Sequence, residues 1–324
     1  MYPAYKTHLF SSELFRRAEE ARRFLAPCGV CPRACGVDRL AGKTGVCGIG
    51  AKATVASALA HHGEEPGLSG ARGAGTIFFG GCNLRCIFCQ NHQISQTSHS
   101  PEYGPEEIAA MMVRLQGEGC HNIDLVSPSH VAPQVLEAIA RAAEQGLSIP
   151  ILYNSNGYDS LDMLRLFDGV ADIYLPDLKY GDDSTGTWAS SVDNYVEHAH
   201  AALKEMYRQV GDVEFDNNGI VRRGLIVRIL VLPDDLARVY DSLVFLAEEI
   251  STRVWLSVMS QYYPTHRAVG HPKLGRSITP KEYETVLEWV DRLGFENFYA
   301  QGMDSVEVCR PDFEKDGVFD FGEA

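Results

Sequence analysis

The chain has 324 residues, 45% of them hydrophobic and 22% charged, which is the composition of a globular protein and excludes extensive disorder. Its 29 Lys and Arg residues against 43 Asp and Glu residues give a formal net charge of −14, and this charge repels a phosphate backbone, so nucleic acid is not an expected partner. No stretch is long and apolar enough for a membrane span or a secretory signal, so we expect a cytoplasmic protein, in which nine cysteines indicate metal or redox chemistry rather than disulfides.

The first feature along the chain is a group of four cysteines in a segment rich in Gly and Pro. The spacing is C-x2-C-x3-C-x11-C, and the residues are Cys28, Cys31, Cys35 and Cys47. Four sulfur ligands complete a zinc site or a second iron–sulfur cluster, with a structural or electron-relay role. Reduced thiols without a metal are the alternative. We expect this N-terminal part, with its Cys-rich metal site, to cover residues 1–73.

From residue 74 to about residue 310, short apolar runs rich in β-branched residues alternate with longer helical periods. The predicted strands are 76–80, 123–127, 151–154, 172–176, 225–232 and 254–259. The predicted helices are 105–116, 132–144, 160–167, 189–210, 235–250 and 280–293, the last capped by Thr279. An Asn-Gly pair at 218–219 predicts a small hairpin. The alternation indicates an α/β fold with a parallel sheet, either an open doubly wound sheet or an incomplete barrel, followed by an acidic, solvated tail at 311–324.

A second group of three cysteines directly follows the first predicted strand. Cys82, Cys86 and Cys89 have the spacing C-x3-C-x2-C, which holds three irons of a cubane [4Fe-4S] cluster and leaves the fourth iron open. A structural zinc site would need a fourth ligand, for which His92 is the nearest candidate in sequence. Since the carboxyl end of a parallel strand is where α/β folds place their active sites, we expect the open iron to be catalytic.

The triplet, with Phe88 before its last cysteine, resembles the motif of the radical S-adenosylmethionine (SAM) enzymes, and the chain is similar to their group related to pyruvate formate-lyase activating enzyme. The resemblance covers about residues 74–310 and implies an incomplete (β/α)6 barrel of the TIM type. It also implies that the open iron binds SAM and that a one-electron donor such as flavodoxin or ferredoxin reduces the cluster. SAM then yields methionine and a 5′-deoxyadenosyl radical, which takes a hydrogen atom from a substrate.

The resemblance extends to residues that follow later strands. Asn156, in the segment Asn-Ser-Asn-Gly at 154–157, would lie near the cofactor. Asp177 and Lys179 match an Asp-x-Lys motif whose lysine meets the cofactor carboxylate or ribose, and Arg228 matches an arginine that binds the carboxylate. The alternatives are a plain turn at Asn156, a local ion pair between Asp177 and Lys179, and a pair between Arg228 and an acidic residue of a neighbouring strand.

One segment departs from the family pattern. Where the family carries Gly-Gly-Glu-Pro, which receives the SAM ammonium group, this chain reads Val-Ser-Pro-Ser-His at residues 126–130. We expect Ser127 and Ser129 to accept hydrogen bonds from the ammonium, and His130 to be a partner or a proton-transfer group. The alternative for His130 is a structural hydrogen-bond donor.

Three further features complete the set. Residues 61–66, His-His-Gly-Glu-Glu-Pro, are expected to form a solvated loop, with a place at the substrate entrance as the alternative. Gln261 and Tyr262 follow the last predicted strand and are candidates to touch the substrate or the adenine. Cys120 and Cys309 have no partner spacing and are expected to be buried, inert thiols.

The resemblance predicts a radical SAM oxidoreductase that activates a glycyl radical enzyme by abstracting a hydrogen atom from a backbone glycine of that partner. A radical SAM enzyme acting on a small molecule, a protein side chain or RNA is the first alternative, and the net charge disfavours RNA. The second alternative is an iron–sulfur protein for electron transfer or cluster delivery, without catalysis.

Overall fold

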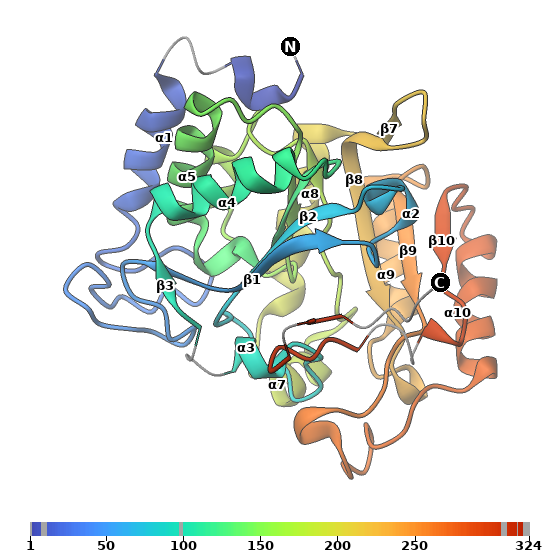
Figure 1. Ribbon diagram of the computed structural model, residues 1–324. Coiled ribbons are helices and arrows are strands. Elements are labelled where there is room, and N and C mark those ends of the chain that lie inside the picture. The colour runs from blue at the N-terminus through green and yellow to red at the C-terminus, as the bar shows by residue number, and fades with distance from the viewer. Residues whose placement is uncertain (1, 8–11, 97–99, 306–309, 316, 320–324) are drawn as a thin grey trace.

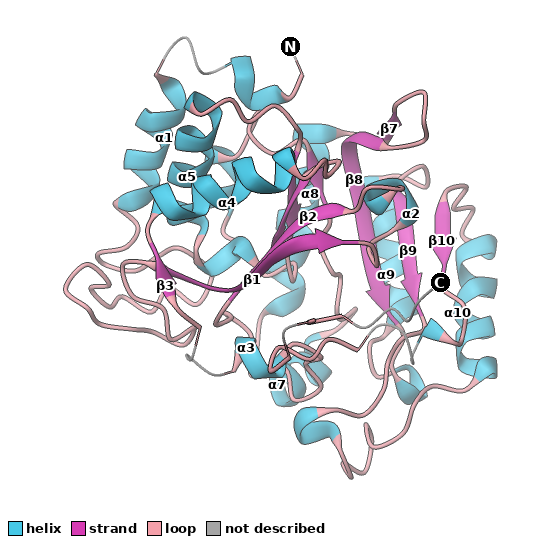
Figure 2. Ribbon diagram, viewed as in Figure 1, coloured by secondary structure: helices cyan, strands magenta, loops and turns pink. Residues whose placement is uncertain are grey.

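A ten-stranded sheet organises the protein, whose computed structural model describes residues 2–7, 12–96, 100–305, 310–315 and 317–319 (Figures 1 and 2). The strands are β1 (Ala53–His61), β2 (Ala74–Phe79), β3 (Glu102–Tyr103), β4 (Ile123–Val126), β5 (Ile151–Asn154), β6 (Ile173–Tyr174), β7 (Glu214–Phe215), β8 (Val221–Leu230), β9 (Trp255–Met259) and β10 (Phe298–Ala300). Their order in the sheet is β10-β9-β8-β6-β5-β4-β2-β1-β3, and β7 pairs with β8 in the predicted hairpin. The pairs from β10 to β2 are parallel, whereas β1, β3 and β7 pair antiparallel. The expected α/β fold with a largely parallel sheet is confirmed.

Helices connect the parallel strands. They are α1 (Glu13–Arg22), α2 (Pro66–Ser69), α3 (His92–Ser95), α4 (Pro105–Gly117), α5 (Ala132–Glu144), α6 (Leu161–Leu166), α7 (Asp183–Ser190), α8 (Tyr195–Val210), α9 (Val239–Phe245) and α10 (Pro280–Arg292), with a π turn at Leu246–Ile250 and 3-10 turns at Ala4–Thr7, Pro128–His130, Pro233–Asp235 and His266–Ala268. α10 begins at the predicted cap, because Thr279 Oγ1 accepts from Glu282 N at 3.3 Å and the Glu282 carboxylate accepts from Thr279 N at 2.7 Å. Among the described residues, no helix has both the length and the apolar character needed to cross a bilayer.

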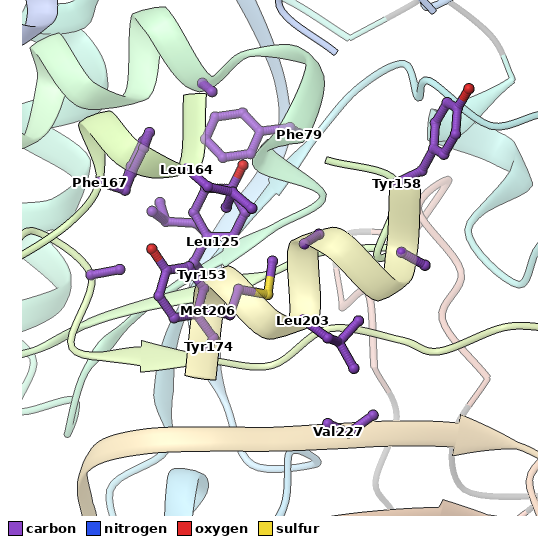
Figure 3. Close-up of a cluster of buried hydrophobic side chains, with 14 of the residues drawn as sticks. Phe79, Leu125, Tyr153, Tyr158, Leu164, Phe167, Tyr174, Leu203, Met206 and Val227 are labelled. Carbon is purple, nitrogen blue, oxygen red and sulfur yellow. The ribbon is translucent and has the colours of Figure 1, made fainter. Parts of the chain in front are cut away.

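The apolar core lies between the sheet and its helices, and Figure 3 shows the part near α6 and α8. Tyr153 of β5 packs edge-on against Phe167, with ring centroids 5.1 Å apart. Leu203 and Met206 of α8 are fully buried in the same cluster. The residues that flank Tyr153 in β5 face the other side of the sheet, where they are also buried. The strands are thus covered on both faces, as their continuous apolar runs predicted.

Two predicted helices are shorter than expected. Ser191 has a left-handed backbone (φ 55°), which separates α7 from α8 within the predicted helix 189–210. Asp235 and Arg238 are also left-handed (φ 50° and 54°), so the helix predicted at 235–250 begins only at Val239. Apolar periodicity continues across such single-residue turns, so it does not reveal them.

Strand β1 was not predicted, because its sequence consists mainly of Ala, Ser and Thr and lacks large β-forming side chains. It pairs antiparallel with β2, with His61 opposite Ala74 and Leu59 opposite Thr76. The N-terminal part therefore contributes a strand to the main sheet, and the predicted boundary at residue 73 lies between two paired strands.

The two ends of the sheet approach one another through α2, which lies beyond the end of β1 (Figure 1). A side chain at Gly67 would lie 2.9 Å from the hydroxyl of Tyr299 in β10 and 2.9 Å from a methyl of Val221 in β8. Since β1 and β10 stand far apart in the strand order, the sheet curves to bring them together. Leu68 of α2 packs in the same region with Leu152 of β5 and its apolar neighbours.

Candidate active site

A cavity of about 590 Å³ opens at the carboxyl ends of the parallel strands. It is lined by most of the residues predicted from the sequence, namely Cys82, Cys86 and Cys89 after β2, Ser127 after β4, Asn156 after β5, Asp177 and Lys179 after β6, and Arg228 in β8. These residues come together because the carboxyl ends of parallel strands meet at one edge of the sheet. Ser129 and His130 are not brought to the cavity.

The three cysteines of the triplet are adjacent thiols next to hydroxyl groups. Cys86 Sγ lies 2.9 Å from Ser190 Oγ, and Cys89 Sγ lies 3.2 Å from Ser95 Oγ. Burial, followed by the nearby Cys86 thiol, raises the pKa of Cys82 to about 12 and that of Cys89 to about 11. A buried thiol becomes a thiolate when a positive centre replaces its proton. The donor set therefore fits an iron–sulfur cluster with one iron left open.

Among the described residues, no three His, Cys, Asp or Glu side chains are grouped around a single metal-ion position. In a cubane cluster each thiolate binds a different iron, and the fit of the triplet rests on its three adjacent sulfur donors. His92, the candidate fourth ligand of a zinc site, donates from Nδ1 to Cys89 O at 3.2 Å.

Helix α7 holds the loop that carries the triplet. Arg85 N donates to Ser190 O at 3.1 Å, and Ile87 N donates to Ala189 O at 2.8 Å. The hydroxyl groups of Tyr180 and Ser190 lie 2.6 Å apart, which fixes the serine beside Cys86. Ser190 was missed in the sequence, because residues 189–210 were assigned to one helix and no motif marks this serine.

Asn156 supports the triplet loop. Its Nδ2 donates to Asn83 Oδ1 at 2.7 Å and lies 3.4 Å from Cys82 Sγ, while its Oδ1 accepts from Tyr158 N. The next residue, Gly157, has φ 78°, and a side chain there would lie 2.5 Å from Asp177 O. The chain therefore does turn at residues 156–157, as the alternative for Asn156 predicted. This turn positions Asn156 against Cys82, the first cysteine of the triplet.

Asp177 lies between two cations. Its Oδ1 accepts from Arg228 Nε at 2.8 Å, and its Oδ2 accepts from Lys179 Nζ at 2.6 Å. Burial raises the pKa of the Asp177 carboxyl, but the two cations outweigh burial and the net shift is downward. Arg228 also donates from Nη2 to Asn154 Oδ1 at 2.7 Å and from Nη1 to Glu64 Oε2 at 3.3 Å. Each guanidinium nitrogen of Arg228 thus has a partner within the chain, which agrees with the alternative that Arg228 pairs with an acidic residue nearby. Lys179 has further ammonium donors that remain available for a ligand.

Ser127 and its two predicted neighbours face different ways. Ser127 has a left-handed backbone (φ 58°) and lines the cavity. His130 is 1% exposed and donates from Nε2 to Gly80 O at 2.8 Å, and burial lowers its pKa to about 4, so the ring is neutral and serves as the structural donor expected as the alternative. Ser129 is 2% exposed, and its hydroxyl lowers the pKa of buried Asp159. The 3-10 turn at Pro128–His130 directs both side chains into the core.

Residues 61–66 are only partly solvated: His62, Gly63 and Pro66 are exposed, as expected for a solvated loop, whereas His61 and Glu65 are buried. His61 and Glu65 are 6% and 9% exposed, and both line the cavity together with Glu64. The cause is β1, which carries the chain antiparallel to β2 and delivers this segment to the inner side of the curved sheet. A Glu-Glu pair directly before Pro66 was the available signal in the sequence.

Part of the described C-terminal tail covers one side of the cavity: Glu314, Lys315 and Gly317 are exposed, as expected for a solvated tail, but Val318 is buried and Phe319 lines the cavity. The rings of Phe313 and Phe319 pack on Phe78, with centroids 5.3 and 5.6 Å away, and Phe319 lines the cavity. Gln93 of α3 donates from Nε2 to Asp312 Oδ1 at 3.0 Å. The sequence missed this contact because it joins segments more than 200 residues apart.

Of the remaining candidate residues, one lines the cavity and others are buried elsewhere. Gln261 lines the cavity, as expected. Tyr262 does not, because it is 1% exposed and its hydroxyl donates to Leu274 O at 2.7 Å. Cys120 is a buried thiol, 2% exposed. Cys309 lies outside the described residues.

The four cysteines of the N-terminal segment are neighbours. Burial is the main cause that raises the pKa of Cys31 to about 12, and the nearby thiols of Cys47, Cys28 and Cys35 contribute to this rise. All four are free thiols. No three of these described thiols are grouped around a single metal-ion position, so the four-sulfur metal site stays a prediction from the sequence.

The N-terminal segment is packed against the triplet loop. Gly81 has φ 73°, and a side chain there would lie 2.5 Å from Cys47 O. Arg33 Nε donates to Asn83 O at 2.8 Å, and Arg85 Nη2 donates at 2.6 Å to the carbonyl just before Cys47. The two cysteine groups are therefore joined by direct backbone and side-chain contacts.

Comparison with known proteins identifies a family and a relative to which this chain is similar. The family model described as Radical SAM superfamily matches residues 76–233. The uncharacterized protein MJ0674 of Methanocaldococcus jannaschii is 29% identical over 294 residues, which cover 87% of this chain and 80% of that protein.

Two solved structures are weakly similar. SuiB of Streptococcus suis has a TM-score of 0.47 and 10% identity and covers 70% of this chain, and methylornithine synthase (PylB) has a TM-score of 0.46 and 17% identity over the same share. The chain spans 49% of the length of SuiB and 65% of that of PylB.

The matched region contains the cysteine triplet and the predicted residues after β4, β5 and β6, together with Arg228 in β8. Such a domain implies SAM and a [4Fe-4S] cluster as cofactors. Residues 76–233 are a radical SAM superfamily domain.

Proposed function

We propose that this chain cleaves SAM reductively at a [4Fe-4S] cluster held by Cys82, Cys86 and Cys89, and abstracts a hydrogen atom from a substrate. When bound and reduced by a donor such as flavodoxin or ferredoxin, cluster and SAM together supply methionine and a 5′-deoxyadenosyl radical. The observation that carries the proposal is that three adjacent thiols and the polar residues after β4, β5 and β6 meet in one cavity of a radical SAM domain.

The chain's own residues would bind and shield the cofactor. Lys179 has ammonium donors available for the SAM carboxylate or ribose, and Ser127 presents a hydroxyl for the SAM ammonium. Asn156 keeps the triplet loop in place. The cavity wall also includes Phe78 and Met259, whose apolar side chains exclude water from a reactive radical. The curved sheet that carries these residues would be the incomplete (β/α)6 barrel that the resemblance implies.

Anaerobic reconstitution with iron and sulfide tests the cluster. We expect about four irons per chain from the triplet, and about eight if the N-terminal cysteines hold a second cluster. About four irons with one zinc would assign zinc to Cys28, Cys31, Cys35 and Cys47. Replacing all three triplet cysteines by Ala should remove about four irons, whereas Cys120→Ala should remove none.

Reduction with dithionite in the presence of SAM tests the activity. The reconstituted protein should form 5′-deoxyadenosine and methionine in equal amounts, and the triplet variant should form neither. A reconstituted protein that carries the cluster but forms no 5′-deoxyadenosine would contradict the proposal and favour an electron-transfer or cluster-delivery protein.

The substrate has two candidates. The resemblance points to a backbone glycine of a partner enzyme. A small molecule is favoured by two observations: Phe319 of the tail occupies part of the cavity wall, and Glu64 and Glu65 place carboxylates inside it. A polypeptide would have to displace the tail and bury these carboxylates, whereas a small molecule needs neither step. Transfer of deuterium into 5′-deoxyadenosine from a glycine-deuterated partner protein would select the first candidate instead.

A further inference from the structure

The inner part of the cavity has more acidic than basic side chains. Four carboxylates and two cations lie there or directly behind its wall: Glu64, Glu65, Asp124 and Asp177 against Lys179 and Arg228. The cations are already engaged, since Lys179 pairs with Asp177 and Arg228 is shared between Asp177 and Glu64. His61 adds no positive charge, because burial lowers its pKa to about 4.

Glu65 and Asp124 are left without a bonded cation among the described residues. Glu65 is 9% exposed, and its Oε2 is fully buried without a hydrogen-bond partner. Asp124 is 0% exposed; its Oδ2 accepts from Thr76 Oγ1 at 3.2 Å and Asn154 lowers its pKa, but its Oδ1 has no partner within hydrogen-bond distance. Buried polar atoms are normally bonded, so the unbonded oxygen of Glu65, which lines the cavity, marks a place where a ligand donates, while Asp124 lies behind the cavity wall.

The pKa values agree with this geometry. Burial is the first cause that raises the pKa of Glu65 and of Asp124, Arg228 lowers both, and the charge of Glu64 raises both again. One additional positive charge at this place would stabilise both carboxylates in their ionised form.

The carboxylates lie deeper than the cofactor residues. Asp124 is opposite Thr76 and two residues before Val126, which is roughly 7 Å below the end of β4 at about 3.3 Å per residue. Cys82 and Lys179 instead follow the carboxyl ends of their strands. Glu65 follows β1, whose last residue His61 pairs with Ala74 at the start of β2, so a ligand group that reaches Glu65 lies toward the amino end of β2, away from the triplet.

Apolar side chains line the cavity between this acidic region and its opening, at the carboxyl ends of β8, β9 and β10. Leu230, Met259 and Ala300 line the same cavity as Glu64 and Glu65. An organic cation with a short apolar body matches this combination, because its ammonium reaches the carboxylates while its carbon chain contacts the apolar wall.

We propose that Glu64 and Glu65, backed by Asp124, bind the primary ammonium group of a small-molecule amine, which is the substrate class of this site. The inference rests on the proposed function only for what happens to the amine after it binds. Binding itself is measured without reductant, so the two proposals fail separately.

The test compares n-butylamine with n-butanol, which has similar size and no charge. Calorimetric titration of the reconstituted protein with SAM present, at pH 7.5 and without oxygen, should give at least tenfold tighter binding of n-butylammonium. Glu65→Gln should weaken its binding at least tenfold, while Glu288→Gln, at an exposed position on α10, should not change it. Equal binding of the amine and the alcohol, or an unchanged Glu65→Gln variant, would overturn the proposal.

The loss of binding in Glu65→Gln must also be selective for the amine over SAM. If Glu65→Gln weakens SAM binding by the same factor, the carboxylate serves the cofactor ammonium and the proposal is wrong. If this variant does not fold, the comparison of amine and alcohol on the unaltered protein decides alone. A protein that binds the amine but forms no 5′-deoxyadenosine would contradict the proposed function and leave the amine site standing.

Discussion

Asn156 and Asn83, which are 73 residues apart in the chain, join the loops after β5 and β2 by a hydrogen bond of 2.7 Å from Nδ2 to Oδ1. The same Nδ2 lies 3.4 Å from Cys82 Sγ, and Asn83 donates in turn to Tyr158 O at 2.7 Å. Both asparagines are buried. The first cysteine of the triplet is thus held by a bond between two strand ends rather than by its own loop alone.

Asn156→Ala should loosen this arrangement. The change leaves the buried Oδ1 of Asn83 with only the weak thiol donor of Cys82, which costs about 1–3 kcal/mol of stability. Iron content after reconstitution should fall, and 5′-deoxyadenosine formation per iron should fall with it. Asn218→Ala, on the exposed hairpin, is the control and should retain both values. Full iron content in Asn156→Ala would show that the loop does not depend on this bond.

Arg228→Met should be strongly destabilising. Arg228 is nearly enclosed and neutralises Asp177 and Glu64, so its removal leaves buried carboxylates uncompensated, at a cost of about 3–5 kcal/mol. Arg276→Met removes an exposed arginine that pairs with Glu282, and should cost about 1 kcal/mol or less. Urea unfolding of both variants measures the difference, and equal losses would contradict the view that Arg228 is mainly a partner of these carboxylates.

Glu65→Gln should stabilise the protein at high pH. Burial raises the pKa of Glu65 above its unfolded value, so its contribution to stability is complete below the unfolded pKa and is lost as the pH rises through the folded pKa. Gln has no proton to lose, so the variant should gain stability relative to the parent between pH 5 and pH 8.

Glu282→Gln should change the stability at high pH in the opposite direction. The hydrogen bond from Arg276 lowers the pKa of Glu282, so its stabilising effect is present above the unfolded pKa and is lost only in acid. This variant should be less stable than the parent at pH 8. Urea unfolding midpoints measured at pH 5 and pH 8 check both variants. If Glu65→Gln gains no stability over the parent at pH 8, the raised pKa of Glu65 is wrong.

Gly81→Ala should disturb both cysteine groups. The residue has φ 73°, and the added carbon would lie 2.5 Å from Cys47 O, so strain and a backbone clash combine. Gly219→Ala is the matched control, because its φ is 77° and nothing lies within 4 Å of the added carbon. Both variants should lose about 1–2 kcal/mol through backbone strain, but only Gly81→Ala should lose iron. Equal iron contents would show that the contact between the groups is not needed for metal binding.

Some elements were predictable because their signals are local. β5 and α5 have the predicted bounds, since each is a bounded apolar pattern with a clear period. The hairpin at Asn218-Gly219 follows from turn chemistry, and Gly219 has the positive φ (77°) that such a turn requires. The break at Ser191 was missed, because a single left-handed residue inside an apolar period leaves no trace in the pattern.

The sequence by itself determined the donor set and the edge of the sheet where it lies. The spacing of Cys82, Cys86 and Cys89 and the polar residues that follow each apolar run are properties of short segments, and parallel strands bring such segments to one edge. Only the tertiary structure decided what else enters the cavity. Glu65 reaches it because β1 pairs antiparallel to β2, and Phe319 reaches it because its ring packs on Phe78. These contacts join distant parts of the chain, and their free energy depends on packing that no local pattern encodes.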